Sequence, residues 1–185
     1  MKKIDKMYQD SLMSENLVKD FLTQKFNLQF HGVPHIEQKA MISKGIHIPD
    51  ILCVEKPHVA FEVKEDLMSA QTGNLCFELK CFAQLRVWGW EQNIKNIYVL
   101  YINHIDFALD VFELGMGSAR LEFELDTLAS KDSQCRLVTG GDWNNELYLL
   151  PLKKARRLHS CITKRFFDDV DLFLFSKSAQ IKLKR

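Results

Sequence analysis

Apolar residues recur at three- and four-residue steps near the start of the chain, which is the spacing of one face of an α-helix. The pattern predicts a helix over about residues 9–26, with apolar positions Leu12, Val18, Phe21, Leu22 and Phe26. Glu15 falls within this stripe, three residues from both Leu12 and Val18. A carboxylate on an apolar face is costly unless it is paired or binds a metal ion, so Glu15 is a candidate functional residue.

Three β-type segments follow, and the last of them carries charged residues on one face. The segments cover residues 38–43, 46–54 and 58–64. In the third, apolar residues alternate with a set that includes Glu62 and Lys64. Because period-two alternation is typical of a strand, we expect Glu62 and Lys64 on the same strand face, opposite an apolar one.

The next segments complete an α/β pattern. Residues 74–79 alternate as a strand would, but they also fit a helical spacing that continues downstream, so both alternatives stay open. A helix is expected over 80–92. NIYVLYIN at 96–103 is the clearest strand, because it is rich in β-branched and aromatic residues. The order helix, three strands, helix, strand predicts a mixed α/β core with a central sheet.

The remainder of the chain predicts a mixed extension of this core. A final helix is expected across 154–174, after short β-type segments at 107–114, 120–126, 135–139 and 146–152. We therefore expect a single domain over residues 1–185. Its core covers about 10–103, and a C-terminal β-rich and helical elaboration covers about 104–185.

Composition narrows the class of protein. The 185 residues are 46% hydrophobic and 26% charged, which is ordinary for a globular domain. Five cysteines without a disulfide-framework spacing indicate a reducing, cytoplasmic setting. Cys53, Cys76, Cys81 and His58 lack the C-x₂-C spacing of a zinc site, so core thiols are the simpler interpretation. No apolar run approaches the roughly 18 residues of a membrane span, so no membrane partner is expected.

The fragment that carries chemistry reads Pro49-Asp50, eleven further residues, then Glu62-Val63-Lys64. If the two strands pair, the carboxylates of Asp50 and Glu62 converge. Such oxygen donors suit Mg²⁺, and Mn²⁺ can substitute, with water and a substrate phosphate completing the coordination. Lys64 emerges on the same strand face as Glu62, where its ammonium can stabilise an attacking water and the charge that develops on phosphorus.

These residues resemble the PD-(D/E)XK nuclease superfamily over about residues 10–103. The resemblance implies a restriction-endonuclease-like αβββαβ core and a Mg²⁺-dependent nuclease that cuts phosphodiester bonds. Carried over residue by residue, Asp50 and Glu62 match the metal-binding acids and Lys64 the catalytic lysine. The backbone carbonyl of Val63 matches a frequent extra metal ligand, and Glu15 matches an acid that many members carry on the first helix.

Two alternatives compete with this assignment. Glu-x-Lys on a strand is often only a cross-strand ion pair on a solvated face. The same spacing also recurs at Glu78-Leu79-Lys80, although Pro49-Asp50 and Glu62 are separated by a hairpin distance, which favours the first motif. The stretch EVKEDLMSAQTGNLCFEL is similar to some phage and mobile-element nucleases. By that resemblance Glu78 is an auxiliary acid, or else a surface residue, and Gln71 or Gln84 contacts the substrate.

Charge is unevenly distributed along the chain. The net charge of +1 excludes a wholly basic chain, but the residues after 150 are locally basic. We expect a nucleic-acid-binding cluster, or else a solvated face, formed by Lys153, Lys154, Arg156 and Arg157. His31, His35 and His47 are most simply loop or surface histidines, or else one of them contacts a phosphate. DNA is the expected partner before RNA, and a homodimer stays open. The alternative functions are a catalytically silent nucleic-acid-binding or assembly module on the same fold and an unrelated interaction domain.

Overall fold

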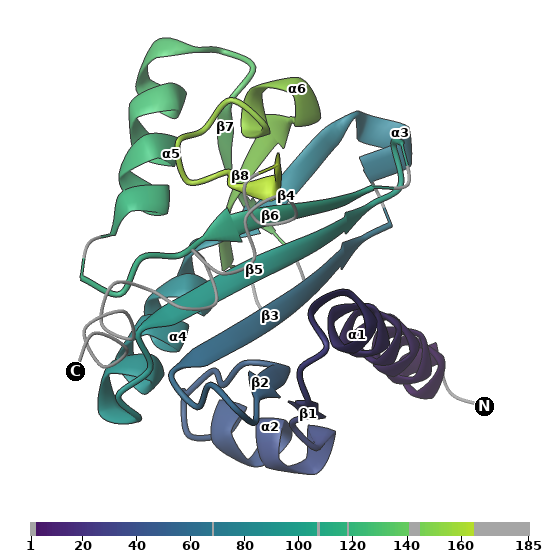
Figure 1. The fold of residues 1–185 in the computed structure, drawn as a ribbon. Helices are drawn as coiled ribbons and strands as arrows, with labels where there is room; N and C mark the ends of the chain where they lie inside the picture. Colours follow the sequence, from purple (N-terminus) through teal and green to yellow (C-terminus); the bar gives the residue numbers. More distant parts are fainter. Residues whose placement is uncertain (1–2, 68, 107, 118, 141–144, 165–185) are drawn as a thin grey trace.

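A mixed five-stranded sheet forms the centre of the fold (Figure 1). The computed structural model describes residues 3–164 except residues 68, 107, 118 and 141–144. The strands run in the order β1 (Phe30–Gly32), β2 (Ile51–Cys53), β3 (Val59–Asp66), β5 (Asn96–Asn103) and β6 (Leu109–Glu113). The pair β3–β5 is parallel and the other neighbouring pairs are antiparallel.

A second, three-stranded antiparallel sheet joins the middle of the chain to its later part. Its order is β4 (Asn74–Glu78), β8 (Asn145–Pro151) and β7 (Arg136–Gly140). β4 therefore pairs with a strand about seventy residues downstream rather than with its sequence neighbours. Residues 145–151 are thus packed into the same body as residues 74–78.

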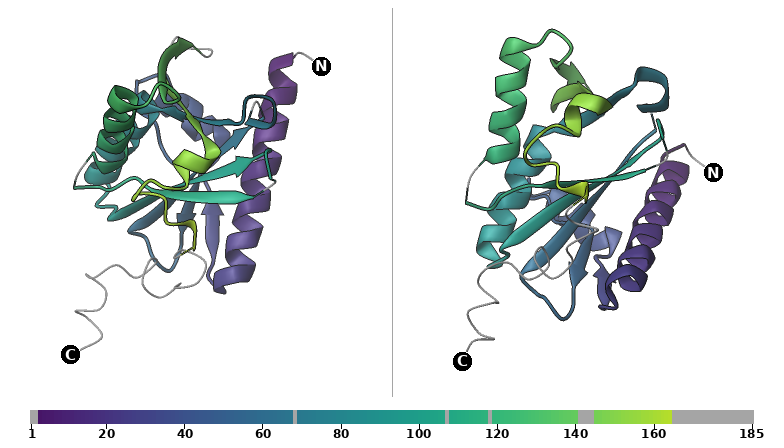
Figure 2. Two further views of the ribbon diagram at one scale, coloured as in Figure 1. Left: turned by 90° about the horizontal axis from the view of Figure 1, so that it is seen from above. Right: turned by 45° about the horizontal axis from the view of Figure 1, so that its top comes forward.

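Helices cover both faces of the central sheet (Figures 1 and 2). α1 (Lys3–Phe26) packs on one face, through a cluster that includes Val18 and Leu22. The opposite face packs against the small sheet, α4 (Leu79–Glu91) and α5 (Arg120–Lys131). The short helices are α2 (His35–Ile42), α3 (Ser69–Thr72) and α6 (Leu152–Ala155). Among the described helices none is long and apolar enough to cross a membrane.

The predicted α/β fold class is confirmed, and the αβββαβ order is present with β1, which was not predicted, in place of the strand expected at 38–43. α1, β1, β2, β3, α4 and β5 follow one another in that order, with α2 inserted before β2 and the α3–β4 segment before α4. The strands at 58–64, 96–103, 107–114, 135–139 and 146–152 and the helix at 80–92 are all present, with ends shifted by a few residues. Residues 74–79, which fitted two patterns, begin as the strand β4 and enter α4 at Leu79.

Three expectations from the sequence are wrong. Residues 38–42 belong to α2 rather than to a strand, and Ser43 is the C-cap of that helix. Gln38, Lys39, Ala40 and Met41 are good helix formers, and none of them is buried in a sheet. Residues 120–126 are helical: Leu121 and Leu125 are buried one turn apart, whereas Phe123 between them is 71% exposed. The expected helix at 154–174 is broken, because residues 156–162 form turns and a bridge to β6; residues 165–174 lie outside the described residues.

The apolar stripe of α1 is also narrower than expected. Val18, Leu22 and Phe26 are buried against the central sheet, but Leu12 and Phe21 remain 47% and 40% exposed. β3, in contrast, is buried on both faces over its first five residues, in the pattern of a central strand. Glu62 lies within that stretch, so a charged group sits in the middle of the fold.

Candidate active site

Strand pairing brings Asp50 beside Glu62. Asp50 directly precedes β2, in which Ile51 is paired with Phe61 of β3. The backbone N–H of Asp50 donates to the carbonyl of Phe61 at 3.1 Å, and its carboxylate Oδ2 accepts the N–H of Val63 at 2.7 Å. The side chain of Asp50 is therefore fixed at the point where β3 changes from apolar to polar residues.

A cavity of about 190 Å³ gathers the candidate residues. It is lined by Glu15, His35, Gln38, Lys39, Ile42, His47, Asp50, Glu62, Val63 and Lys64. The five residues assigned to the site from the sequence thus line one cavity, supplied by α1, the residue before β2, and β3. Lys64 Nζ lies 2.8 Å from Glu62 Oε1, so the lysine reaches the acid two positions earlier on the same strand face.

Each of the three acids accepts a hydrogen bond from the segment between residues 35 and 47. His35 Nε2 contacts Glu15 at 2.9 Å, and Gln38 Nε2 donates to Asp50 Oδ1 at 2.9 Å. His47 Nε2 contacts Glu62 Oε1 at 2.8 Å. The sequence interpretation assigned no role to Gln38. It placed the histidines in loops or on the surface, with a phosphate contact as the alternative for one of them. Three nitrogen donors within thirteen residues, directly before Pro49-Asp50, were the available signal.

Burial gives the two central carboxyls opposite charge preferences. Asp50 is 7% exposed, and burial, together with the carboxylates of Glu62 and Glu15, raises its pKa well above the usual value. Burial would also raise the pKa of Glu62, but the positive charges of His47 and Lys64 outweigh it and lower this pKa to about 2. Without a cation the site therefore favours one ionised and one protonated carboxyl, as expected where like charges are crowded.

One oxygen of the site lacks a hydrogen-bond partner. Among the described residues none reaches Glu62 Oε2, although Glu62 is only 1% exposed. A buried carboxylate oxygen without a partner is costly and calls for a bound group. Glu15 and Asp50 line the same cavity as Glu62, and carboxylates are the ligands that Mg²⁺ and Mn²⁺ accept. The residues present therefore fit a hard divalent cation held by Asp50 and Glu62.

Comparisons with known proteins give little beyond this geometry. No protein-family model matches the chain, and no curated protein sequence matches it. Among solved structures, the chain is similar to one described as the structure of D212, a nuclease from a fusselovirus. The two share 9% sequence identity over 83% of this chain and 86% of that chain, with a TM-score of 0.43. At this TM-score the likeness assigns neither activity nor site residues to the chain.

The auxiliary residues expected from the sequence lie in different surroundings. Glu78 ends β4, and its Oε2 lies 3.5 Å from Lys64 Nζ, so it borders the site. Gln84 of α4 donates to the carbonyl of Gly45 at 2.7 Å and thereby holds the loop after α2. Gln71 is exposed on α3. Lys80 is exposed in the first turn of α4, so Glu78 and Lys80 do not share a strand face as Glu62 and Lys64 do.

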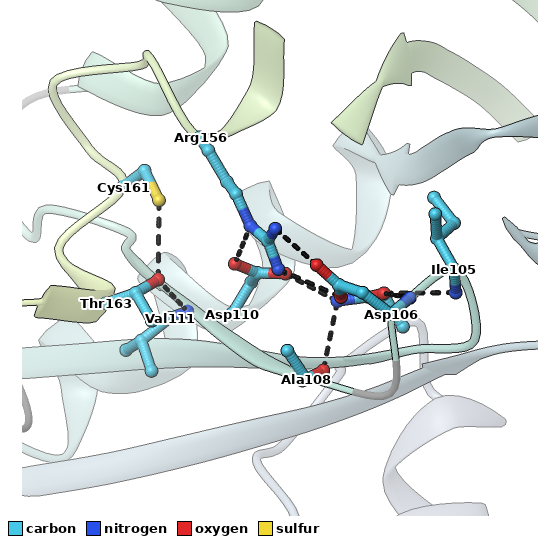
Figure 3. Close-up of polar contacts among 9 residues, drawn as sticks. Ile105, Asp106, Ala108, Asp110, Val111, Arg156, Cys161 and Thr163 are labelled. Atoms are coloured by element: carbon cyan, nitrogen blue, oxygen red, sulfur yellow. Dashed lines mark hydrogen bonds and ion pairs between the residues drawn. The ribbon is translucent and has the colours of Figure 1, made fainter. Parts of the chain in front are cut away.

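Two of the four basic residues after β8, Lys154 and Arg156, form ion pairs with aspartates. Arg156 binds Asp110 through Nε at 2.6 Å and Asp106 through Nη1 at 2.6 Å (Figure 3). Lys154 forms an ion pair with Asp132. Within the described part of the chain, no ion pair is formed by Lys153 or Arg157, and both are exposed. Lys153 and Arg157 are therefore the members best placed to bind an external phosphate.

Replacing Arg156 by alanine is expected to destabilise the fold. Asp110 is 1% exposed, and without the guanidinium it retains, among the described side chains, only the amide of Asn103 as a partner, at 2.6 Å. Leaving a buried carboxylate short of a partner costs about 1–3 kcal/mol. We expect Arg156→Ala to lower the free energy of unfolding by that amount in urea titrations, whereas Arg157→Ala changes it by less than about 0.5 kcal/mol. Equal effects of the two substitutions would contradict a structural role for Arg156.

Proposed function

We propose that the chain is a metal-dependent nuclease that hydrolyses phosphodiester bonds, with DNA as the favoured substrate. The observation that carries the proposal is the buried pairing of Asp50 and Glu62, with one carboxylate oxygen unpartnered and Lys64 beside it. A cross-strand ion pair on a solvated face does not account for this, because Glu62 is 1% exposed. The likeness to PD-(D/E)XK nucleases that the sequence suggested supports the same role for these residues.

In this proposal the chain supplies ligands, a cation and a fixed geometry. Asp50 and Glu62 would hold the metal ion, with the Val63 carbonyl and Glu15 as further oxygen donors. When bound, the ion supplies Lewis-acid stabilisation of the phosphate and a water of lowered pKa. Lys64 places its ammonium where negative charge develops on the phosphoryl oxygens. The amide N–H of Val63, donating to Asp50, keeps that carboxylate in position for its role as ligand.

The test is a cleavage panel over metal ions and substrate structures. Because the proposed ligands are oxygen donors, Mg²⁺ or Mn²⁺ is expected to support cleavage and Ca²⁺ to permit binding with little turnover. The substrates are single-stranded, duplex, flap and junction DNA, each with its RNA counterpart. Activity that persists after EDTA treatment and dialysis would overturn the metal-dependent mechanism, and cleavage of RNA alone would overturn the choice of DNA.

The exposed basic residues are expected to bind the phosphate backbone without reading bases. Lys153 and Arg157 are free of ion pairs within the described residues, and Arg157 also lines an open groove of about 600 Å³ beside α5. Replacing both by alanine should weaken binding to all sequences. The log–log salt slope should fall by about 0.9 for each duplex phosphate that the variant no longer neutralises. Fluorescence anisotropy over a range of salt concentrations measures this slope.

The matched control removes the same charge elsewhere. Lys25 and Lys131 are exposed at the ends of α1 and α5, and a Lys25→Ala/Lys131→Ala variant should keep the wild-type salt slope. If the two double variants lose affinity equally, the effect is one of net charge and the residues after β8 form a solvated face.

The face of α1 that leaves Met13, Leu17 and Phe21 exposed at 74%, 69% and 40% is compatible with a homodimer. This part of the proposal concerns assembly only, since none of these three residues lines the cavity of the candidate site. Sedimentation of the purified chain at several concentrations tests it.

A further inference from the structure

A second set of potential metal ligands lies against the candidate active site. His47, Glu62 and Cys81 each direct one ligand atom into a space where all three atoms lie within 4.8 Å of one another. His47 comes from the loop after α2, Glu62 from β3, and Cys81 from the first turn of α4. Cys81 Sγ lies 3.6 Å from Glu62 Oε1, and His47 Nε2 lies 2.8 Å from the same oxygen. Glu62 also carries the buried, unpartnered Oε2.

We propose that His47, Glu62 and Cys81 form a site for a borderline divalent cation such as Zn²⁺, separate in its ligand chemistry from the oxygen-donor site of Asp50 and Glu62. An imidazole, a carboxylate and a thiolate are the three ligand types that zinc accepts, and three protein ligands leave a fourth position for water. Mg²⁺ does not favour sulfur or imidazole ligands. The softer ligands of the second site would therefore select Zn²⁺ over Mg²⁺.

The separations of Cys81 and His47 from Glu62 are close to what coordination requires, and the separation of Cys81 from His47 is below 4.8 Å. Zinc bonds of about 2.0–2.3 Å place tetrahedral ligands roughly 3.3–3.8 Å apart. The separation of Cys81 Sγ from Glu62 Oε1 already falls in this range, at 3.6 Å. His47 Nε2 must move outward by about half an ångström from its 2.8 Å hydrogen bond, a shift that lengthens an existing contact rather than repacking the core.

Binding exchanges protons for the cation at this site. Burial raises the pKa of the Cys81 thiol well above its usual value, so the thiol is protonated at neutral pH in the metal-free protein. Cation binding releases that proton to solvent, together with any proton on His47 Nε2, and the metal bonds replace S–H and N–H. Lys64, now 2.8 Å from Glu62 Oε1, must give up that oxygen. Glu78 is already within 3.5 Å of its ammonium and offers a second partner.

The consequence is inhibition of the chemistry proposed above, and this consequence alone rests on the proposed function. When Zn²⁺ is bound to Glu62, Lys64 turns toward Glu78. The lysine then no longer lies beside the carboxylate that would hold Mg²⁺. The nuclease would therefore be inhibited by Zn²⁺ at concentrations too low to displace Mg²⁺ from an all-oxygen site.

Cobalt provides a direct test because a Co²⁺–thiolate bond gives a charge-transfer band in the near ultraviolet. Titrating the full chain with Co²⁺ is expected to produce this band, saturating at one equivalent, and Zn²⁺ should bleach it. Cys81→Ser should abolish the band and His47→Gln should weaken cobalt binding by at least about tenfold, the size of effect that loss of a first ligand or its support produces. Cys76→Ser is the matched control: Cys76 is also partly buried near Lys64 but lies outside the cluster, and the variant should keep the band.

The outcomes separate this site from the proposed function. Absence of the band in the wild type, or its persistence in Cys81→Ser, overturns the site; Cys81→Ala provides a second variant if the serine variant does not fold, as judged by circular dichroism. Zinc inhibition of Mg²⁺-dependent cleavage is then measured in each variant relative to its own zinc-free rate, and it should be lost with Cys81→Ser. A cobalt band without any cleavage in Mg²⁺ supports the His47–Glu62–Cys81 site and overturns the proposed nuclease activity. Cleavage in Mg²⁺ without a cobalt band supports the nuclease activity and overturns the site.

Discussion

Lys64→Ala is expected to lower the rate of Mg²⁺-dependent cleavage by about 10²- to 10³-fold, the range found when one group that stabilises transition-state charge is removed. The fold should persist, because Glu62 Oε1 keeps His47 as a partner at 2.8 Å after the lysine is lost. Single-turnover kinetics with saturating enzyme measure the effect on the chemical step. A far-ultraviolet circular dichroism melt shows whether the variant is folded.

Lys80→Ala is the matched control for this experiment. Lys80 belongs to the second Glu-x-Lys triplet of the chain, but it is exposed in the first turn of α4 and does not line the cavity of the candidate site. Its replacement should leave the cleavage rate within about twofold of the wild type, as for a surface substitution. If Lys64→Ala cleaves normally while Glu78→Ala and Lys80→Ala do not, then the catalytic motif lies sixteen residues downstream of the one proposed.

Asp50→Asn is expected to abolish metal-dependent cleavage and yet stabilise the metal-free protein. Burial and the nearby carboxylates of Glu62 and Glu15 raise the pKa of Asp50, so ionising it at neutral pH costs folding free energy. Asparagine removes that charge. Its carbonyl oxygen can still accept the N–H of Val63, and Gln38 can rotate its amide to accept from the new NH₂ group. For a protein of this size each 1 kcal/mol gained raises the thermal midpoint by about 2–4 °C.

The sign of the pH dependence gives a sharper check. Because the pKa of Asp50 is higher in the folded than in the unfolded protein, wild-type stability falls as pH rises from the ordinary aspartate value of about 3.9 through the raised value. The pKa of Glu62 is lowered to about 2, so its own contribution to stability is lost as pH falls from the ordinary glutamate value of about 4.3, but Glu62 is present in both proteins and this contribution cancels from their difference. The advantage of Asp50→Asn in EDTA should therefore be larger near about pH 8 than near about pH 4.5.

Adding Mg²⁺ should reverse the order of the two proteins. A ligand that binds only the folded state stabilises it, and the wild type retains both acids that would hold the ion. Asp20→Asn, which removes an exposed carboxylate from α1, serves as the control and should follow the wild type at both pH values with and without Mg²⁺. An Asp50→Asn variant that is less stable than the wild type at every pH would contradict a site strained by charge repulsion.

The elements that the sequence could predict are those with a strong period. β3 and β5 are buried central strands, and their alternating or continuous apolar residues gave their positions to within two residues. The candidate acids could be found for the same reason. Glu62 interrupts the apolar pattern of β3, and Asp50 directly precedes β2, the antiparallel neighbour of β3. Residues 120–126 were misassigned because Leu121, Phe123 and Leu125 alternate, although only the two leucines are buried, at helical spacing.

The residues that support the acids could not be predicted in this way. Gln38 and His47 act through single hydrogen bonds to Asp50 and Glu62, and such partners depend on which loop lies over the strand, not on any period. Cys81 illustrates the same limit. Cys81 lies beside Glu62 because β4 leads directly into α4. The spacing of the cysteines along the chain does not predict this contact.

The helix α2 has a consequence for how the cavity opens. Its side chains cap Glu15 and Asp50, yet none of its residues is buried. Little apolar surface therefore holds it to the sheet, so the free energy of lifting this helix alone is small compared with that of unfolding the strands beneath it. The carboxylates would become accessible to water, ions and a phosphate backbone through a local opening that leaves β3 and β5 intact. Access to the acids is thus set by the low local stability of α2, which lies over the more stable strands β3 and β5.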